Sequence, residues 1–297
     1  MNGLRYVFGL CLVFFAVIIG LQSGNGNTGN GKDLLRTTDV VEAFYQHGTE
    51  ITLSHDLSPA EFLIENKLPA IYEFPGSGEK LFIYEFSDMN RRNEALAGIY
   101  QQGSLDSTEG FRRLQYEQEN LINPIRAKNI LLIYVIQYDS KVVSEIKDVA
   151  SLDKFTSLFA PNLELIKNIV LEDLNDGVKI LYQGKGQAWE GKVLLEYYQY
   201  SWIDESGKIR SESWSNENFW VKYLGKDSKL IKQIVCSYHG PAGNGQGVFE
   251  YADRSLDKDG YVNLGSSGGT GMVNTNGEYF MTIGWGEKSE TFTLEKP

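Results

Sequence analysis

Cysteine is almost absent from this chain, which has two cysteines in 297 residues. Cys11 lies inside an apolar N-terminal run, so it is not available to form a disulfide with Cys236. The sequence therefore excludes a fold stabilised by disulfides. Cys236 follows an apolar run and has the strand parity of Ile234, which predicts a buried structural thiol rather than a nucleophile.

Motifs typical of hydrolases and nucleotide-binding proteins are also missing. No Gly-x-Ser-x-Gly occurs, so a serine-elbow hydrolase is not indicated. Residues 240–247 and 265–271 are glycine-rich, but no Gly-Lys-Ser/Thr occurs and strand patterns flank both. We expect them to be mobile loops at one end of a β-sandwich rather than phosphate sites.

Metal ligands are scarce as well. The three histidines have no spacing that would put two of them on one helix face, and they are His47, His55 and His239. Residues 257–260 (DKDG) resemble the middle of a calcium loop, but an EF-hand needs carboxylates where this chain has Ser255 and Ser266. We predict a hairpin turn there, and no metal or other cofactor.

Basic residues are outnumbered by acidic ones, and the formal net charge is −11. Without its first 31 residues, the chain has 27 Lys and Arg against 39 Asp and Glu, a net charge of −12. This balance opposes binding to nucleic acid or to an anionic membrane surface.

Long hydrophobic runs are absent except at the N-terminus, over residues 6–21. Arg5 precedes this run, and a Gly/Asn-rich tract over residues 22–31 follows it, which predicts that the rest of the chain is translocated. The run fits an uncleaved membrane anchor with a flexible stalk, or a cleaved signal peptide, in which case the protein is secreted. A lipoprotein is disfavoured because Leu10 is too large for the position before a lipidated Cys11, and because the apolar run continues after it.

Residues 32–176 are predicted to form an α+β domain. Capping signals predict helices that begin near Asp39 and Ser58, and Ser87 or Asp88 is expected to cap a third that ends near Gly103. The expected strands are residues 70–74, 80–86 and 129–137, the last of them central, and further helices are expected over residues 152–159 and from Pro161.

Residues 177–297 are predicted to form an all-β, immunoglobulin-like sandwich. Short strand patterns recur there between turns that contain Gly, Asn or Asp. The expected turns are residues 204–207, 224–227, 257–260, 274–277 and 285–288.

Four stretches together resemble uncharacterised membrane-associated envelope proteins of Bacillus-type Gram-positive bacteria. They are residues 40–44 (VVEAF), 80–86 (KLFIYEF), 127–134 (AKNILLIY) and 281–292 (MTIGWGEKSETF). The resemblance spans most of the chain after residue 31 and consists of residues that define a fold pattern. It implies an exported, membrane-associated protein, and no activity or catalytic residue comes with it.

Aromatic residues supply the one candidate site. Strand alternation over residues 192–203 puts Tyr198, Tyr200 and Trp202 on one face with two charged residues, as on a partly solvated surface, and Trp214 and Trp220 are expected on adjacent strands. Exposed aromatic rings bind sugars or anchor protein partners. The alternative is ordinary cross-strand pairing within a sandwich.

These observations predict an extracytoplasmic, membrane-associated binding or interaction module of the cell envelope. The expected partners are the membrane, through the N-terminal segment, and an envelope protein or a glycan, with no nucleic acid. The alternative is a cell-envelope hydrolase, which would need a cleft with convergent titratable groups that the sequence does not identify.

Overall fold

The computed structural model describes residues 34–101, 108–117, 120–137, 162–226, 231–251 and 256–296. Strands account for 49% and helices for 21% of the residues that the structure describes, so this part of the chain is mostly β-sheet. The chain divides into two compact units, one ending at Asp176 and the other beginning at Gly177. The predicted membrane segment and the helix expected over residues 152–159 lie outside the described residues, and no described helix is long and apolar enough to cross a membrane.

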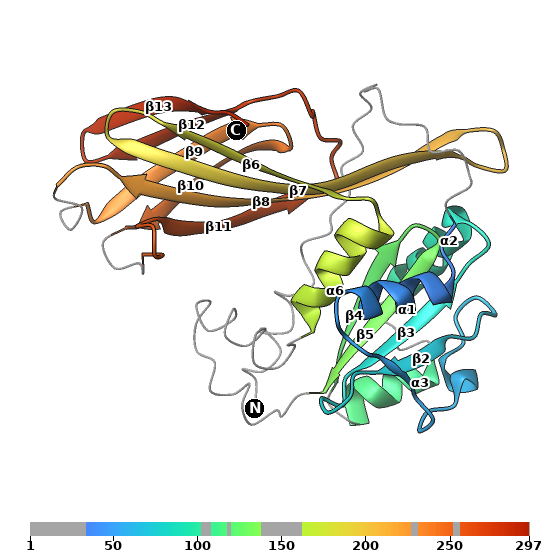
Figure 1. The fold of residues 1–297 in the computed structure, drawn as a ribbon. Coiled ribbons are helices and arrows are strands. Elements are labelled where there is room, and N and C mark those ends of the chain that lie inside the picture. Colours follow the sequence, from blue (N-terminus) through green and yellow to red (C-terminus); the bar gives the residue numbers. More distant parts are fainter. Residues whose placement is uncertain are drawn as a thin grey trace. The chain divides into compact units, whose positions relative to one another are not determined.

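The unit that ends at Asp176 is built on a five-stranded antiparallel sheet (Figure 1). In the order β1-β2-β3-β5-β4, its strands are Thr52–Leu53, Ala70–Glu73, Lys80–Glu85, Ile130–Gln137 and Asn120–Ala127. The hairpin predicted over residues 70–86 is confirmed, since β2 and β3 pair in antiparallel register. β5 pairs with strands on both of its edges, although the middle position of the sheet belongs to β3.

Helices cover both faces of this sheet. α1 (Thr37–Gln46), α6 (Leu163–Ile169) and its continuation η4 (Val170–Leu174) pack on one face, where Leu132 and Tyr134 of β5 lie. The other face of the sheet, where Leu131 and Ile133 lie, is covered by four short elements. They are η1 (Pro59–Phe62), α2 (Met89–Gln101), α3 (Glu109–Arg112) and its continuation η3 (Arg113–Glu117). β5 is therefore buried on both faces, which explains its unbroken apolar sequence.

The structure corrects one predicted helix start and decides between two candidate caps for another. α1 begins at Thr37, so the prediction that Asp39 is its N-cap is wrong. Asp39 lies inside the first turn, and its carboxylate accepts a 2.7 Å hydrogen bond from the backbone N–H of Arg36, where the helix dipole favours a negative charge. For α2 the structure selects Asp88 as the cap, because its carboxylate accepts a 2.9 Å hydrogen bond from the N–H of Arg91.

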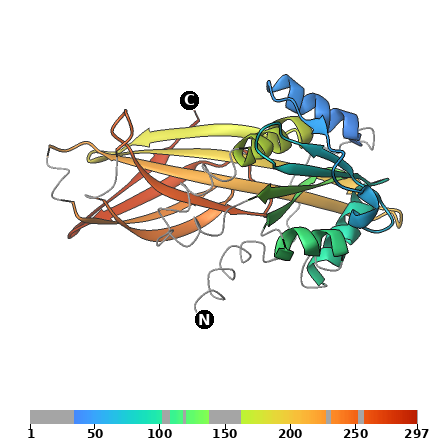
Figure 2. The same cartoon turned by 90° about the horizontal axis from the view of Figure 1, so that it is seen from below.

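The unit that begins at Gly177 consists of two four-stranded antiparallel sheets that share one core (Figures 1 and 2). One sheet has the order β11-β8-β7-β6, with strands Val262–Gly269, Ile209–Tyr223, Trp189–Ile203 and Val178–Lys185. The other has the order β10-β9-β12-β13, with strands Gly243–Glu250, Gln233–Gly240, Tyr279–Trp285 and Lys288–Leu294.

The core between the sheets is apolar and aromatic. Trp189, Val193 and Leu195 of β7 are fully buried in it, together with Met281 and Ile283 of β12. These β7 residues have the opposite strand parity to Tyr198, Tyr200 and Trp202, as alternation along a strand requires. The two sheets therefore form a two-layered β structure around one hydrophobic cluster.

Strand order departs from that of immunoglobulin domains. Such domains place their strands as ABED and CFG. Here the first three strands, β6, β7 and β8, are successive neighbours in one sheet. The resemblance to an immunoglobulin sandwich therefore does not extend to the connectivity.

The two sheets are joined along one side. Gln183 of β6 and Glu295, just after β13, exchange two backbone hydrogen bonds of 2.9 Å. The backbones approach so closely beside this bridge that a Cβ atom on Gly184 would lie 1.9 Å from the carbonyl oxygen of Thr293. Gly184 is therefore required by this contact.

The expectation that the two glycine-rich stretches form mobile loops is wrong. Residues 243–250 form the edge strand β10, and residues 265–269 belong to the edge strand β11. Some of their glycines make room for an aromatic ring or for backbone: a Cβ atom on Gly245 would lie 2.7 Å from the ring of Tyr238, and one on Gly268 would lie 2.7 Å from the carbonyl oxygen of Ser215. At Gly245 and Gly268 the glycine therefore reflects close packing rather than loop formation.

Candidate functional site

The β7–β8 hairpin is the longest that the structure describes, with 15 residues in each strand. β6 pairs with β7 only as far as Tyr197, and β11 pairs with β8 only as far as Ser215. The six cross-strand pairs beyond these points, from Tyr198–Trp214 to Ile203–Ile209, have no third described strand beside them (Figure 1). We call residues 198–214 the ribbon.

The turn at the end of the ribbon is organised by Asp204. Its carboxylate accepts hydrogen bonds from Ser206 Oγ at 2.6 Å and from the backbone N–H groups of Ser206 and Lys208 at 2.9 Å. Arg210 Nε adds an ion pair at 2.8 Å. The hydrogen bonds from Ser206 and Lys208 hold the pKa of Asp204 well below its ordinary value. Gly207, with φ of +79°, supplies the left-handed conformation that closes the turn.

Four of the five predicted aromatic residues meet on one face of the ribbon. The ring centroids of Trp214 and Tyr198 are 6.1 Å apart, those of Tyr198 and Tyr200 are 5.8 Å apart, and those of Tyr200 and Trp202 are 5.9 Å apart. The rings therefore form one continuous row, which we call the aromatic ladder. Cross-strand pairing alone accounts only for the contact between Tyr198 and Trp214.

The fifth residue, Trp220, does not join the aromatic ladder. It lies on β8 opposite Lys192, where β7 and β8 are part of the four-stranded sheet. Asn216 and Asn218 occupy the same face of β8 between Trp214 and Trp220, so the two rings are separated along the strand.

The aromatic ladder is less open than its mixed charge pattern predicted. Tyr198 is buried, while Tyr200, Trp202 and Trp214 are half-buried. The rings of Tyr200 and Trp214 stack on Tyr198 with interplanar angles of 15° and 20°. The flat faces of these rings are consequently turned toward one another along the ribbon.

The opposite face of the ribbon is covered near the sheet and exposed at its end. Gln199 Oε1 accepts a 3.0 Å hydrogen bond from the N–H of Val273, and Ser213 Oγ donates a 2.6 Å hydrogen bond to the carbonyl oxygen of Thr270. Further out, Ile203 and Ile209 lie directly opposite each other with 72% and 76% of their surfaces exposed. These are among the most exposed large apolar side chains that the structure describes, and sequence reasoning did not single them out.

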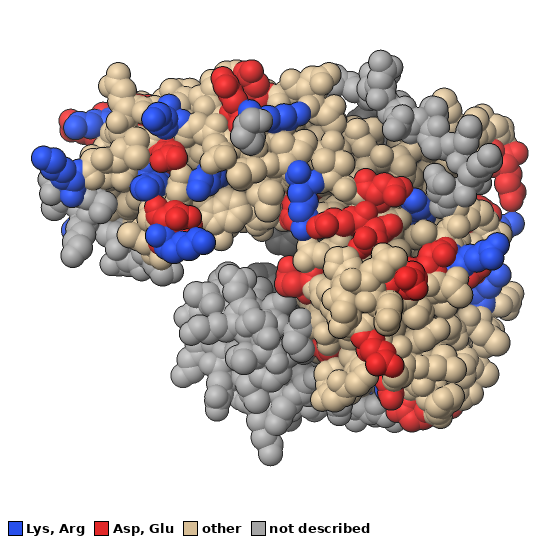
Figure 3. Space-filling view, in the orientation of Figure 1, with Lys and Arg blue, Asp and Glu red and all other residues tan. Residues whose placement is uncertain are grey.

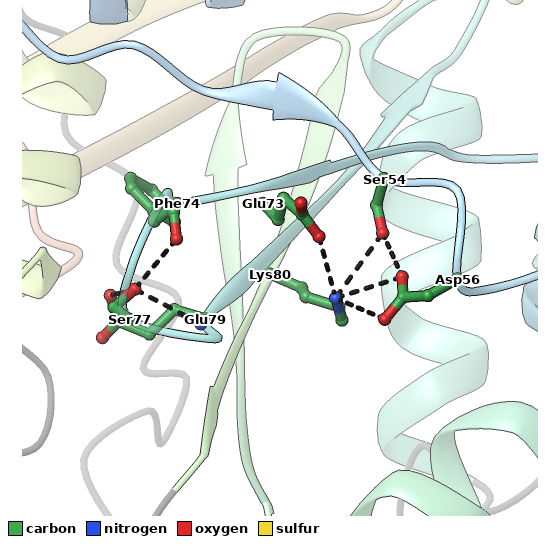
Figure 4. Close-up of polar contacts among 7 residues, drawn as sticks. All are labelled: Ser54, Asp56, Glu73, Phe74, Ser77, Glu79 and Lys80. Carbon is green, nitrogen blue, oxygen red and sulfur yellow. Dashed lines mark hydrogen bonds and ion pairs between the residues drawn. The ribbon is translucent and has the colours of Figure 1, made fainter.

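The strongest candidate for catalysis is a cluster around Lys80 in the unit that ends at Asp176 (Figure 4). Lys80 Nζ lies 3.5 Å from Ser54 Oγ, a distance that suggests a serine–lysine pair. It also lies 3.0 Å from Asp56 and 3.3 Å from Glu73, so its amine is held in two ion pairs rather than directed at the Ser54 hydroxyl alone. The Ser54 hydroxyl donates a hydrogen bond to Asp56, and this bond, followed by the contact with Lys80, lowers the pKa of Asp56. The cluster ties β1 to the β2–β3 hairpin and is not arranged for nucleophilic attack.

The buried carboxylate of Glu79, on the turn before β3, belongs to a separate set of contacts. It accepts hydrogen bonds from Ser77 Oγ at 3.0 Å, from the hydroxyl of Tyr134 and from the side-chain amide of Asn162. Ser77 also bonds to the carbonyl oxygen of Phe74, which closes the turn (Figure 4). Three donors on one buried acid satisfy its hydrogen-bonding capacity and indicate a structural role.

Other residues considered for chemistry have structural partners. Cys236 is buried, which raises the pKa of its thiol to about 12, so the prediction of a structural thiol is confirmed. Asp257 accepts hydrogen bonds from the N–H groups of Asp259 and Tyr261 at 2.9 and 2.8 Å, which confirms a turn. Among the described residues no group of three or more His, Cys, Asp or Glu side chains is placed to hold a metal ion.

Charges of both signs alternate over the unit that begins at Gly177. On the face that Figure 3 shows, its Lys and Arg side chains are interspersed with Asp and Glu rather than gathered into one basic patch. Lys179 and Glu196 form one such pair on adjacent strands at 3.1 Å. The visible face therefore offers no basic track for a phosphate backbone.

Comparison with known proteins gives no family assignment: no family model, no curated protein and no solved structure matches this chain.

Proposed function

We propose that this chain is a non-enzymatic binding module of the cell envelope, and that the ribbon is its recognition element. One observation carries the proposal: the ribbon extends six residue pairs beyond its last neighbouring strand and ends in the exposed pair Ile203 and Ile209. A two-stranded ribbon gains little stability by itself in water. Large apolar side chains that a structure leaves exposed at the end of such a ribbon favour a contact with another molecule.

The chemistry of the ribbon favours a protein partner over a glycan. Sugars stack on the flat faces of aromatic rings, but the faces of Tyr198, Tyr200 and Trp214 are turned toward one another. Ile203 and Ile209 offer aliphatic surface, whose burial in an apolar pocket contributes roughly 1.5–3 kcal/mol for each side chain. An aliphatic anchor seated in a pocket is one kind of central contact in a protein–protein interface.

The proposed location is the outer face of the membrane, with the N-terminal segment as an anchor or, if it is cleaved, as a signal peptide. The support is the order of Arg5, the apolar run over residues 6–21 and the Gly/Asn-rich tract that follows. Protease added to intact protoplasts should then digest the chain after residue 31. Complete protection of that region in intact protoplasts would contradict the location.

The binding role is tested by co-purification from intact envelopes. The paired variant Ile203→Ser with Ile209→Ser should reduce the recovery of a specific protein at least tenfold, about 1.4 kcal/mol in binding free energy. The matched control is Val235→Ser with Phe280→Ser, because these side chains are 37% and 47% exposed on strands of the other sheet. Equal losses in both paired variants, or no loss in either, would remove the support for the ribbon.

A further inference from the structure

The strand β10 lies at the end of its sheet and has no described strand on its outer edge. Its inner edge pairs with β9 over eight residue pairs, from Gly243–Gly240 to Glu250–Gln233. The strand at the other end of the sheet, β13, is followed by the bridge between Glu295 and Gln183 that joins the two sheets. β10 therefore presents a row of backbone donors and acceptors along one side.

Within β10 itself, the described residues include none of the sequence devices that normally prevent strand addition. β10 has no proline and no charged residue before Glu250, and its register with β9 is unbroken. The edge strand of the other sheet, β11, has a register shift between Asn263 and Gly265 that interrupts its edge. Val248, at 59% exposure, adds apolar surface to the unprotected edge.

We infer that β10 pairs with β10 of a second copy of this chain, antiparallel, about a twofold axis at Gln246. The two-residue turn between β9 and β10 makes Gly240 and Gly243 the first hydrogen-bonded pair of the hairpin. Alternation then directs the backbone groups of Asn244, Gln246 and Val248 toward the open edge.

The register about Gln246 is self-complementary. Gln246 lies opposite its own symmetry mate, and Asn244 lies opposite Val248 of the second copy, so residues with outward-directed backbone groups meet one another. Gly245 lies opposite Gly247, which leaves no steric conflict between side chains. The result is one continuous eight-stranded sheet across the two copies.

The charge pattern of β10 permits a second copy at this place. Two chains that each have a net charge of −11 repel each other over most of their surfaces. The only charged residue of β10, Glu250, falls opposite the position of Ala242, so this register opposes no two carboxylates. The interface is small by the standard of stable dimers, so the association should depend on protein concentration. It does not involve the ribbon and is independent of the proposed function.

The first test is the mass of the full-length protein in mild detergent across a concentration series, measured by sedimentation velocity. The wild type should pass from monomer to dimer. Gln246→Lys puts two like charges opposite each other at the axis and should raise the dissociation constant at least tenfold. Phe280→Lys adds the same charge to β12 of this sheet, away from the edge, and should leave the constant unchanged.

The second test fixes the register through disulfide formation, in a Cys11→Ser background. A hydrogen-bonded antiparallel pair has Cα atoms about 5.5 Å apart, which suits a disulfide. Gln246→Cys should therefore link two copies under mild oxidation. Asn244→Cys should not, because its mate would lie roughly 13 Å away along the strands. A monomer at every concentration, a dimer unaffected by Gln246→Lys, or equal linkage at both positions would overturn the inference.

Discussion

The hydroxyl of Tyr279 donates a 2.5 Å hydrogen bond to the carboxylate of Glu217 across the core of the unit that begins at Gly177, here called the β unit. Glu217 belongs to β8 and Tyr279 to β12, so the bond joins the two sheets. The second carboxylate oxygen accepts a hydrogen bond from the hydroxyl of Tyr238 at 3.4 Å. Glu217 is only 3% exposed, and burial raises its pKa although both tyrosine hydroxyls act in the opposite direction.

This arrangement makes the stability of the β unit depend on pH. Because the pKa of Glu217 is raised in the folded state, its contribution is complete below the unfolded pKa, near 4.3, and is lost as the pH rises through the folded value. Glu217→Gln keeps an acceptor for Tyr279 and removes the charge. The stability of Glu217→Gln relative to wild type should therefore be higher at pH 7 than at pH 4, as measured by urea denaturation at both values. Glu278→Gln, at an exposed position, is the control, and the same pH trend in both variants would contradict this role for Glu217.

The bridge between the two sheets predicts that the stability of this unit depends strongly on Gly184. Gly184→Ala forces a methyl group against the carbonyl oxygen of Thr293, so it should cost about 1–3 kcal/mol of unfolding free energy. Gly269→Ala, where a Cβ atom would meet nothing within 4 Å, should change stability by no more than about 0.5 kcal/mol. Thermal or denaturant unfolding of the two variants checks the pair, and equal effects would argue against the close approach of β6 and β13.

Two tryptophans on the same strand should behave differently. Trp189 is fully buried in the core, and Trp189→Ala should cost roughly 3–5 kcal/mol of stability. Trp202 is half-buried at the outer end of the aromatic ladder, where loss of one aromatic pair is worth about 0.5–1.5 kcal/mol. Denaturation curves of the two variants separate these outcomes. A loss at Trp202 as large as that at Trp189 would show that the ribbon is part of a core rather than a recognition element.

Much of the local structure could be predicted from the sequence because the spacing of apolar residues indicates which side chains are buried. The unbroken apolar run over residues 129–137 identified β5 as an inner strand of its sheet, and β5 is buried on both faces. The edge strand β10 was missed because its alternate glycines suggest a loop. Gly245 instead makes room for the ring of Tyr238, which belongs to the neighbouring strand β9 and is not visible from the local sequence.

The candidate site was predicted only in part, because the local sequence determines only some of its features. Strand parity correctly placed Tyr198, Tyr200 and Trp202 on one face, since alternation is a local property. The continuity of the aromatic ladder and the exposure of Ile203 and Ile209 depend on where β6 and β11 end, which the sequence of β7 does not contain. These two features depend on pairing between strands that are far apart in the sequence, so the local sequence could not predict them.

The end of the ribbon is proposed to contact a partner protein, and site-specific photo-crosslinking in intact cells tests this contact most directly. A photoreactive residue at position 203 should give a discrete protein adduct that diminishes when unlabelled wild-type protein is co-expressed, whereas the same residue at position 280 should give none. An adduct at position 280 alone, or adducts at position 203 that contain lipid or glycan and no protein, would contradict the account.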